Sequence, residues 1–410
     1  MVALDSDFVR NQFPAFRQMD LRDKVYCENA GGSFACRYTV WRIHRYFNER
    51  RVQPYGAFAL SRLAGEEMDE ARVRLAAHMG VARDEVHFGP STSANAYVLA
   101  QAFRQWLPAG AAIIVTDQDH EANSGPWRRL GEDGGLEIRA WEVDPGTGHL
   151  DPDDLDRLLD ERVRLVCFPH ASNILGEVND AAAICRKVRE AGALSCVDGV
   201  SYAPHGLPDL REIGADIYLF SAYKTYGPHQ GIMVMRRELA HRLPNQGHIF
   251  NATDTIKRLN PAGPDHAQVA ACAGIADYID ALYDHHYRGG RDAFARARMV
   301  GELIRSQETE ILAPLLDYLS LRGDLRILGR DKAGPHRLPT VSVALSVPAS
   351  EAAGRLARYG ILAGGGDFYA PRLLRAMRVD PARGVLRLSL LHYTRREEVD
   401  RLIGALDCEI

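Results

Sequence analysis

The stretch ALSCVDGVS at residues 193–201 and the stretch IYLFSAYKTYGP at residues 217–228 decide the fold of this chain. Each is an apolar run of strand length that ends in a charged residue: Asp198 closes the first, and Lys224 follows the second. A third apolar run, AAIIV at 111–115, comes shortly before His120. Open α/β sheets bind ligands at the carboxyl ends of their strands, so we expect these three side chains at one edge of a sheet.

Apolar runs and amphipathic stretches alternate through the middle of the chain. The alternation predicts an α/β fold with a mostly parallel sheet. The strands are expected at residues 112–115, 136–140, 163–168, 193–197, 217–220 and 232–235, with helices at 153–159 and 181–191.

The composition changes after the last of these strands. Residues 244–264 are polar and rich in Gly and Pro, and a long helix is expected over 266–285. The rest predicts a smaller α+β domain, with strands near 340–347 and 384–391 and helices near 292–310, 350–359 and 396–406. We therefore expect an N-terminal arm (1–20), a large domain (21–265), and a linking helix with a small C-terminal domain (266–410).

Charge and cysteine usage exclude several classes of function. The 410 residues include 50 Lys and Arg against 54 Asp and Glu, which favours neither nucleic acid nor an anionic membrane as a partner. The N-terminus lacks the pattern of a signal peptide, and no run approaches the ~18 apolar residues of a membrane span, so we expect a cytoplasmic protein. The seven cysteines form no CxxC pair, and neither disulfides nor a metal site are expected.

The chemistry of the three charged side chains becomes specific when they are taken together. A pyridoxal 5′-phosphate (PLP) enzyme needs a lysine for the Schiff base, a carboxylate at the pyridine nitrogen and a ring that stacks on the cofactor. Lys224, Asp198 and His120 supply these parts. Hydroxyls at a helix N-terminus bind phosphate, and Ser91-Thr92-Ser93 precedes an expected helix at 95–106. The joint arrangement predicts a PLP enzyme, although each feature alone is more often structural.

From YCENAGG at 26–32 to RLS at 387–389, the chain resembles the class V aminotransferase superfamily, and in particular its cysteine desulfurase-like branch. The resemblance implies PLP-dependent transferase fold type I, with a mostly parallel, seven-stranded sheet and a smaller C-terminal α+β domain. SNILG at 172–176 resembles the SNxxG turn of the family, whose Asn contacts the cofactor ring oxygen. Arg387 matches the arginine that binds the substrate carboxylate, a task that suits a bidentate guanidinium.

The resemblance implies three sets of site residues. Lys224, His120, Asp198 and Arg387 are the predicted catalytic residues. The predicted cofactor-binding residues are Lys224, Asp198, His120, Asn173, Ser221, Tyr223, Thr92, Ser93, Ser201 and Gly263. The predicted substrate-binding residues are Arg387, Ala30, Gly31, Asp367 and Tyr369. Ala262-Gly263 stands where the family has a Gly-Thr pair from the neighbouring subunit, and residues 55–62 resemble a second shared segment, so a homodimer with composite active sites is implied.

The chain departs from the cysteine desulfurase pattern at one loop. The loop that carries the nucleophilic cysteine in that branch reads AGGGDFYA at residues 363–370, a composition that predicts flexibility but offers no thiol. Cys27 is the other thiol to consider, although it suits a buried apolar position equally well. Either Asp367 or Tyr369 could face a leaving group instead.

These observations support three hypotheses about the function. The first is a PLP-dependent lyase that acts on an amino acid by β-elimination or C–S bond cleavage, which needs no cysteine. The second is an aminotransferase or epimerase, which would use the same residues. The third is a catalytically silent binding protein on the same fold, against which the complete set of Lys224, Asp198, His120 and Arg387 argues.

Overall fold

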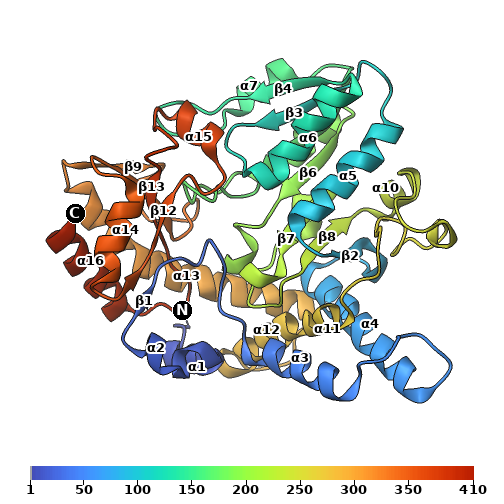
Figure 1. The fold of residues 1–410 in the computed structure, drawn as a ribbon, viewed down its shortest axis with the longest axis horizontal. Helices are drawn as coiled ribbons and strands as arrows, with labels where there is room; N and C mark the ends of the chain where they lie inside the picture. The colour runs from blue at the N-terminus through green and yellow to red at the C-terminus, as the bar shows by residue number, and fades with distance from the viewer. Residues whose placement is uncertain (1) are drawn as a thin grey trace.

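The computed structural model describes residues 2–410, apart from the side chain of Asp133. Its largest element is a sheet of seven strands, whose place in the molecule is shown in Figure 1. Their order is β2-β8-β7-β6-β5-β3-β4, and β8 is antiparallel to both its neighbours while the other pairs are parallel. The strands are β2 (Val86–Gly89), β3 (Ala112–Thr116), β4 (Glu137–Trp141), β5 (Val163–Pro169), β6 (Leu194–Asp198), β7 (Ile217–Ser221) and β8 (Gly231–Met235). The expected α/β fold with a mostly parallel, seven-stranded sheet is confirmed.

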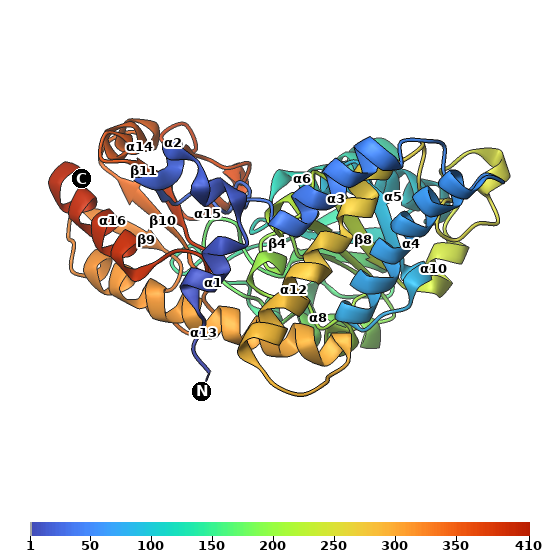
Figure 2. The ribbon, with the colours of Figure 1, turned by 90° about the horizontal axis from the view of Figure 1, so that it is seen from below.

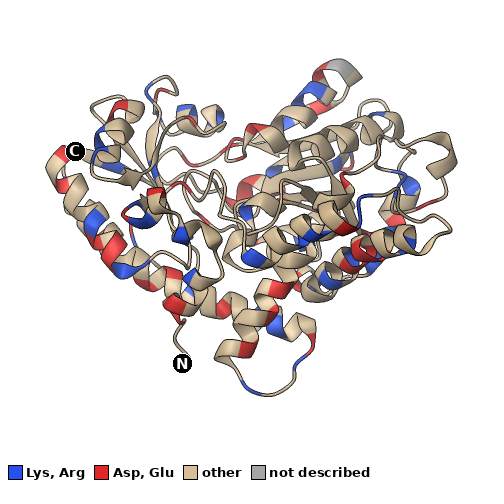
Figure 3. Ribbon diagram, turned by 60° about the horizontal axis from the view of Figure 1, so that its bottom comes forward, with Lys and Arg blue, Asp and Glu red and all other residues tan. Residues whose placement is uncertain are grey.

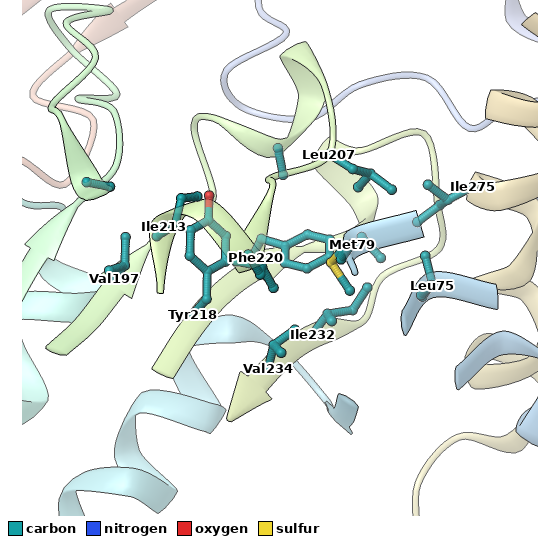
Figure 4. Close-up of a cluster of buried hydrophobic side chains, with 14 of the residues drawn as sticks. Leu75, Met79, Val197, Leu207, Ile213, Tyr218, Phe220, Ile232, Val234 and Ile275 are labelled. Atoms are coloured by element: carbon teal, nitrogen blue, oxygen red, sulfur yellow. The ribbon is translucent and has the colours of Figure 1, made fainter. Parts of the chain in front are cut away.

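Helices cover both faces of this sheet because its strands are apolar on both sides. Tyr218 and Phe220 of β7 point to one face, where Leu75 and Met79 pack beside them (Figure 4). The alternate residues of β7 belong to the core of the other face. The first face is covered mainly by α4 (Ala59–Met79), α8 (Ala181–Glu190) and α12 (Ala273–His286), and the second by α5 (Thr92–Trp106), α6 (Glu121–Gly134) and α10 (Arg237–Arg242).

A smaller antiparallel sheet of order β12-β13-β10-β9 forms the C-terminal part. Its strands are β9 (Leu325–Leu328), β10 (Thr340–Leu345), β12 (Gly364–Gly366) and β13 (Val385–Ser389), and α14 (Ala349–Ala357) and α16 (Arg396–Glu409) pack on it. The long helix α13 (Ala293–Ser320) runs beneath both parts of the molecule (Figure 2). Strand β1 (Val25–Tyr26) pairs with β11 (Ile361–Leu362), so an N-terminal segment belongs to the core of the C-terminal part.

Several elements differ in their limits from the sequence expectation. The expected helix 266–285 is divided at Cys272 into α11 (His266–Ala271) and α12. Helix α13 continues past Pro314 to Ser320, because Leu312, Leu315 and Leu319 bury one face in the small-domain core. The remaining helices are α1 (Ser6–Asn11), α2 (Met19–Arg22), α3 (Arg37–Glu49), α7 (Pro152–Leu158), α9 (Leu210–Ile213) and α15 (Pro371–Ala376), with short 3-10 turns that include η4 (Ala222–Lys224) and η5 (Ile249–Asn251).

Two further differences concern the site. Helix α5 begins at Thr92 rather than near residue 95, because the Ser91 hydroxyl caps it by accepting from the Ala94 N–H. The segment expected to be flexible forms β12, in which Gly364, Gly365 and Gly366 pair with the antiparallel strand β13. The expectation of a flexible segment is therefore wrong at these three glycines. Their pairing with β13 orders the backbone despite the conformational freedom of glycine.

Charged residues of both signs are interspersed over the helices (Figure 3). In the part of the chain that the structure describes, no helix is long and apolar enough to cross a membrane.

Candidate active site

Three strand ends converge on one cavity. Asp198 is the last residue of β6, Lys224 lies in η4 directly after β7, and His120 stands between β3 and α6. All three line a cavity of about 300 Å³ at the carboxyl edge of the parallel strands. The other residues that line it are Ser91, Thr92, Ser93, Gln118, Asp119, Ala122, Pro169, Ala171, Asn173, Val200, Ser201, Ser221, Tyr223 and His229.

Lys224 is a buried cation without a hydrogen-bond partner among the described residues. Only 8% of the residue is exposed. Burial, reinforced by the positive charge of Arg387 and opposed by Asp198 and Glu28, lowers the pKa of its ammonium group to about 8. Near pH 8 a lysine held in this way is neutral more often than an exposed lysine is. The neutral amine is the state that attacks a carbonyl carbon.

Asp198 lines the cavity as a buried residue, with a second carboxyl group close by. Its Oδ1 accepts from the Val200 N–H at 2.8 Å, and burial raises its pKa to about 6. Asp119 is also buried; its Oδ2 accepts from the Asn123 side chain at 2.6 Å. Burial and the charge of Asp198 raise the pKa of Asp119 well above its usual range. The buried carboxyl pair therefore favours a cationic or N–H donor group beside it.

His120 is held as a neutral ring. It caps α6, and its Nδ1 accepts from the Ala122 N–H at 2.9 Å. Burial lowers its pKa to about 3, and the positive charges of Lys224 and Arg387 act in the same direction. The ring thus remains uncharged above about pH 4 and offers a flat apolar face to the cavity.

Hydroxyl groups gather where α5 begins. Thr92 Oγ1 and Ser221 Oγ lie 2.8 Å apart, and Ser91 and Ser93 line the same cavity. The first turn of α5 also presents N–H groups that have no partner within the helix. Gly231 permits this close approach, because a Cβ there would lie 2.3 Å from the Ser91 carbonyl carbon. The corner has the hydroxyls, the free N–H groups and the helix dipole that suit a phosphate group.

A second cavity, of about 480 Å³, opens from the first and shares His120, Asn173 and Lys224 with it. Arg387 lines this larger cavity, and its Nη2 donates to Glu28 Oε1 at 2.6 Å. The other residues that line it are Ala30, Gly31, Ser93, Tyr97, Glu121, Ala122, Arg129, Tyr223, Phe368 and Tyr369. The structure thus brings Arg387, Ala30, Gly31 and Tyr369 to the same space as Lys224.

Two of the predicted site residues lie elsewhere. Gly263 lines a separate hollow beside Tyr55 and does not reach Lys224 within this chain. Asp367 does not line either of the two cavities, and its Oδ1 accepts from the Tyr369 N–H at 3.0 Å, which makes it a turn residue. Cys27 is fully buried in the small-domain core, and burial raises the pKa of its thiol far above the usual range.

Some lining residues had not been expected from the sequence. They include Gln118, Asp119, Val200 and Glu28, which lie close in the chain to residues that had been expected. Proximity in the sequence was the available signal for them. His229 lies five positions after Lys224 and stacks on the Tyr223 ring, with centroids 4.8 Å apart and an interplanar angle of 11°. A strand–turn pattern does not predict that stacking, because it depends on how η4 turns back into β8.

The residues present fit PLP. The hydroxyl corner suits the phosphate, and the buried carboxyl of Asp198 suits a protonated pyridine nitrogen. The side-chain Oδ1 of Asn173 is buried without a partner among the described residues, and a polar group of a ligand would satisfy it. Lys224 stands within the same cavity as these groups, and is the lysine that could bind the cofactor covalently.

Comparison with known proteins agrees with this geometry. Residues 25–262 match the family model described as "Aminotransferase class-V". The chain is 32% identical to "Aminotransferase-like protein FGM3" of Gibberella zeae, over 97% of each chain. It is 30% identical to "Probable cysteine desulfurase" of Xylella fastidiosa, over 98% of this chain and 95% of the other. The fold matches that of the cysteine desulfurase CsdA of Escherichia coli with a TM-score of 0.83 and 23% identity, over 99% and 98% of the two chains.

The chain belongs to the class V aminotransferase family. It is a PLP-dependent enzyme of fold type I.

Proposed function

We propose that this enzyme cleaves the bond between Cβ and a leaving group, most simply a C–S bond, in an amino-acid substrate. The observation that carries the proposal is that Lys224 and Arg387 share one cavity, while no cysteine lines it among the described residues. A buried lysine beside an arginine suits an amino acid whose carboxylate is held and whose Cα proton is removed. Relatives named as cysteine desulfurases support C–S chemistry.

Each side chain has a task that its environment supports. The bound cofactor would draw electrons from the bond between Cα and its proton, and so make that proton acidic. The Nζ of Lys224, whose pKa burial lowers to about 8, would accept the proton. Asp198 would hold a proton on the ring nitrogen of the cofactor, and His120 would keep the ring in place. Thr92, Ser93 and Ser221 would bind the phosphate.

Arg387 would bind the substrate carboxylate, and Tyr369 is the candidate to assist the leaving group. The Tyr369 ring lies 5.4 Å from that of His120, between centroids, and 69% of the residue is exposed. A phenol at the open side of the cavity can donate a proton or a hydrogen bond to a departing thiolate. Asn173, Tyr223, Ser201, Ala30 and Gly31 complete the proposed site, and Gly263 would come from a second copy.

Product analysis tests the reaction type. The holoenzyme is incubated with cysteine, cystine, cystathionine and alanine, and the products are identified by mass spectrometry. β-Elimination predicts pyruvate and ammonia from the sulfur-containing substrates. A keto acid that keeps the whole side chain, formed together with pyridoxamine phosphate, would show an aminotransferase, and inversion at Cα would show an epimerase. Lys224→Ala is the matched control.

We also propose that the enzyme is a homodimer with composite active sites. Tyr55 and Gly263 line a hollow of about 510 Å³ that is separate from Lys224. Large apolar side chains are exposed around it or on the adjoining helices; they are Trp41, Phe47, Phe58, Ile249 and Phe250. A second copy of the chain would cover them, since monomers rarely expose so many apolar side chains together. A cytoplasmic location is part of the same proposal, supported by six buried cysteines that carry free thiols.

A further inference from the structure

Arg387, which we propose binds the substrate carboxylate, already forms an ion pair with the Glu28 carboxylate. Arg387 Nη2 donates to Glu28 Oε1 at 2.6 Å, and only 4% of the Arg387 side chain is exposed. An ion pair in such a position is poorly screened by water, so it is stronger than a surface pair.

The guanidinium group is fixed on its other sides as well. Its Nη1 donates to the Asn173 carbonyl oxygen at 3.3 Å, and its central carbon lies 3.7 Å from the centroid of the Phe368 ring. The Nε has no partner among the described residues. Arg387 therefore cannot turn away from Glu28 without losing two further contacts, and a ligand must approach the group as it stands.

The chain makes room for the Glu28 carboxylate at two glycines. A Cβ at Gly364 would lie 2.4 Å from Glu28 Oε2, and a Cβ at Gly31 would lie 2.8 Å from Oε1. Either would displace the carboxylate. The Oε2 atom is buried and has no hydrogen-bond partner in the described chain, although 28% of the side chain is exposed. Glu28 is thus paired with Arg387 through Oε1 only, and its Oε2 lacks a hydrogen bond. The adjoining cavity of about 480 Å³ leaves space for the Glu28 side chain to move.

We propose that Glu28 is a specificity-determining residue that competes with the substrate carboxylate for Arg387. The inference rests on the proposed role of Arg387 in binding that carboxylate. A substrate carboxylate must displace Glu28 or share the guanidinium with it, and two like charges on one guanidinium repel each other. Either route weakens the binding of a carboxylate, whereas any effect of the Glu28 charge on the amine end is common to both kinds of ligand. The site therefore discriminates less between an amino acid and its decarboxylated analogue than Arg387 alone would allow.

Ligand titration of the holoenzyme tests this without relying on turnover. L-Alanine and ethylamine differ only in the carboxylate, and the visible spectrum reports when either amine replaces Lys224 on the cofactor. The quantity to compare is the Kd of ethylamine divided by the Kd of L-alanine. Glu28→Gln should raise this ratio about tenfold or more, because only alanine presents a carboxylate to the vacated guanidinium group.

Three further variants make the result specific. Glu28→Asp keeps the charge but shortens the reach, so it should raise the ratio in the same direction, and it serves if Glu28→Gln does not fold. Glu397→Gln removes an exposed carboxylate that lines neither cavity, and should change the ratio less than twofold. Arg387→Ala should lower the ratio below that of the wild type.

An unchanged or lower ratio in Glu28→Gln, or in Glu28→Asp where that is the folded variant, would overturn the inference. So would an unchanged ratio in Arg387→Ala. A raised ratio in a protein that forms no pyruvate would support the role of Glu28 while refuting the lyase reaction, so the two proposals fail separately.

Discussion

The Glu121 N–H donates to the Tyr369 carbonyl oxygen at 2.8 Å, and this bond ties the first turn of α6 to the segment after β12. Three other contacts hold the same segment: Arg372 pairs with Glu121, the Asn173 side chain donates to the Phe368 carbonyl oxygen at 3.0 Å, and β12 pairs with β13. The resemblance led us to expect the nucleophilic loop of a cysteine desulfurase at residues 363–370; this segment contains no cysteine, and these contacts tie it to the large domain.

We accordingly expect an inefficient cysteine desulfurase. Sulfur transfer by that route needs a thiolate that reaches the substrate sulfur and then hands on the persulfide. The holoenzyme with cysteine and a reductant should form alanine far more slowly than the median enzyme rate of ~10 per second. Sulfide and alanine are followed together. Alanine formation at that rate, together with a persulfide trapped on any cysteine, would contradict this expectation.

Cys27 provides the control for that experiment. Its thiol is fully buried and its pKa is raised by burial, so Cys27→Ala should leave both the product pattern and the rate within about twofold. The variant should lose some stability, on the order of 1 kcal/mol, from the cavity it creates. Loss of alanine formation together with the persulfide would identify Cys27 as a nucleophile.

The hydroxyl corner predicts a loss of cofactor affinity. Ser221→Ala and Thr92→Val would each remove a proposed hydrogen bond to the phosphate, and a hydrogen bond to a charged group contributes about 1.5–3 kcal/mol. Each variant should therefore bind PLP about tenfold more weakly or worse, measured by equilibrium dialysis of the reconstituted protein. Ser350→Ala, at an exposed position in α14, is the matched control. An unchanged affinity for PLP in both variants would contradict the proposal that these hydroxyls bind the phosphate.

The buried charge of Lys224 predicts a pH-dependent stability of the cofactor-free protein. Burial lowers its pKa from 10.5 to about 8, so the native state disfavours the proton that the unfolded state retains. The resulting decrease in the free energy of unfolding is fully present below pH 8 and disappears above pH 10.5. Lys224→Met should be more stable than the wild type at pH 7, by at most about 3 kcal/mol.

Denaturant unfolding across this pH range measures the difference. The advantage of Lys224→Met over the wild-type protein should shrink as the pH rises from 8 to 10.5. An advantage that stays constant over this range would show that the charge of Lys224 is not its source.

The proposed dimer predicts a sensitive position at η5. Ile249 is 89% exposed beside the hollow that Gly263 lines, and Ile249→Asp would place a charge in the expected interface. Sedimentation equilibrium should show a dimer for the wild type and a weaker dimer, by about tenfold or more in Kd, for the variant. Leu321→Asp is the control, since Leu321 is 88% exposed at the end of α13. A wild-type monomer with full activity would refute the proposal.

The sequence predicted the sheet and the ends of its strands because apolar runs such as 217–220 are local patterns. It located Lys224, Asp198 and His120 for the same reason. The seating of Glu28 on Arg387 joins residues that are 359 positions apart, and no local pattern contains it. The Gly364–Gly366 strand was missed because the pairing with β13, rather than the composition, orders it. The composition of the loop likewise did not predict that the Asp367 carboxyl group accepts from the Tyr369 N–H and lines neither cavity.

Borohydride reduction of the holoenzyme followed by peptide mass mapping tests the central claim most directly. Five lysines lie in the described chain, and Lys224 alone among them is buried; the others are Lys24, Lys187, Lys257 and Lys332. We predict that the purified protein absorbs visible light near the band of a protonated Schiff base and that reduction fixes the cofactor on Lys224. Lys224→Ala should lose that band and the label while remaining folded. A label on any of the other four lysines would contradict the account.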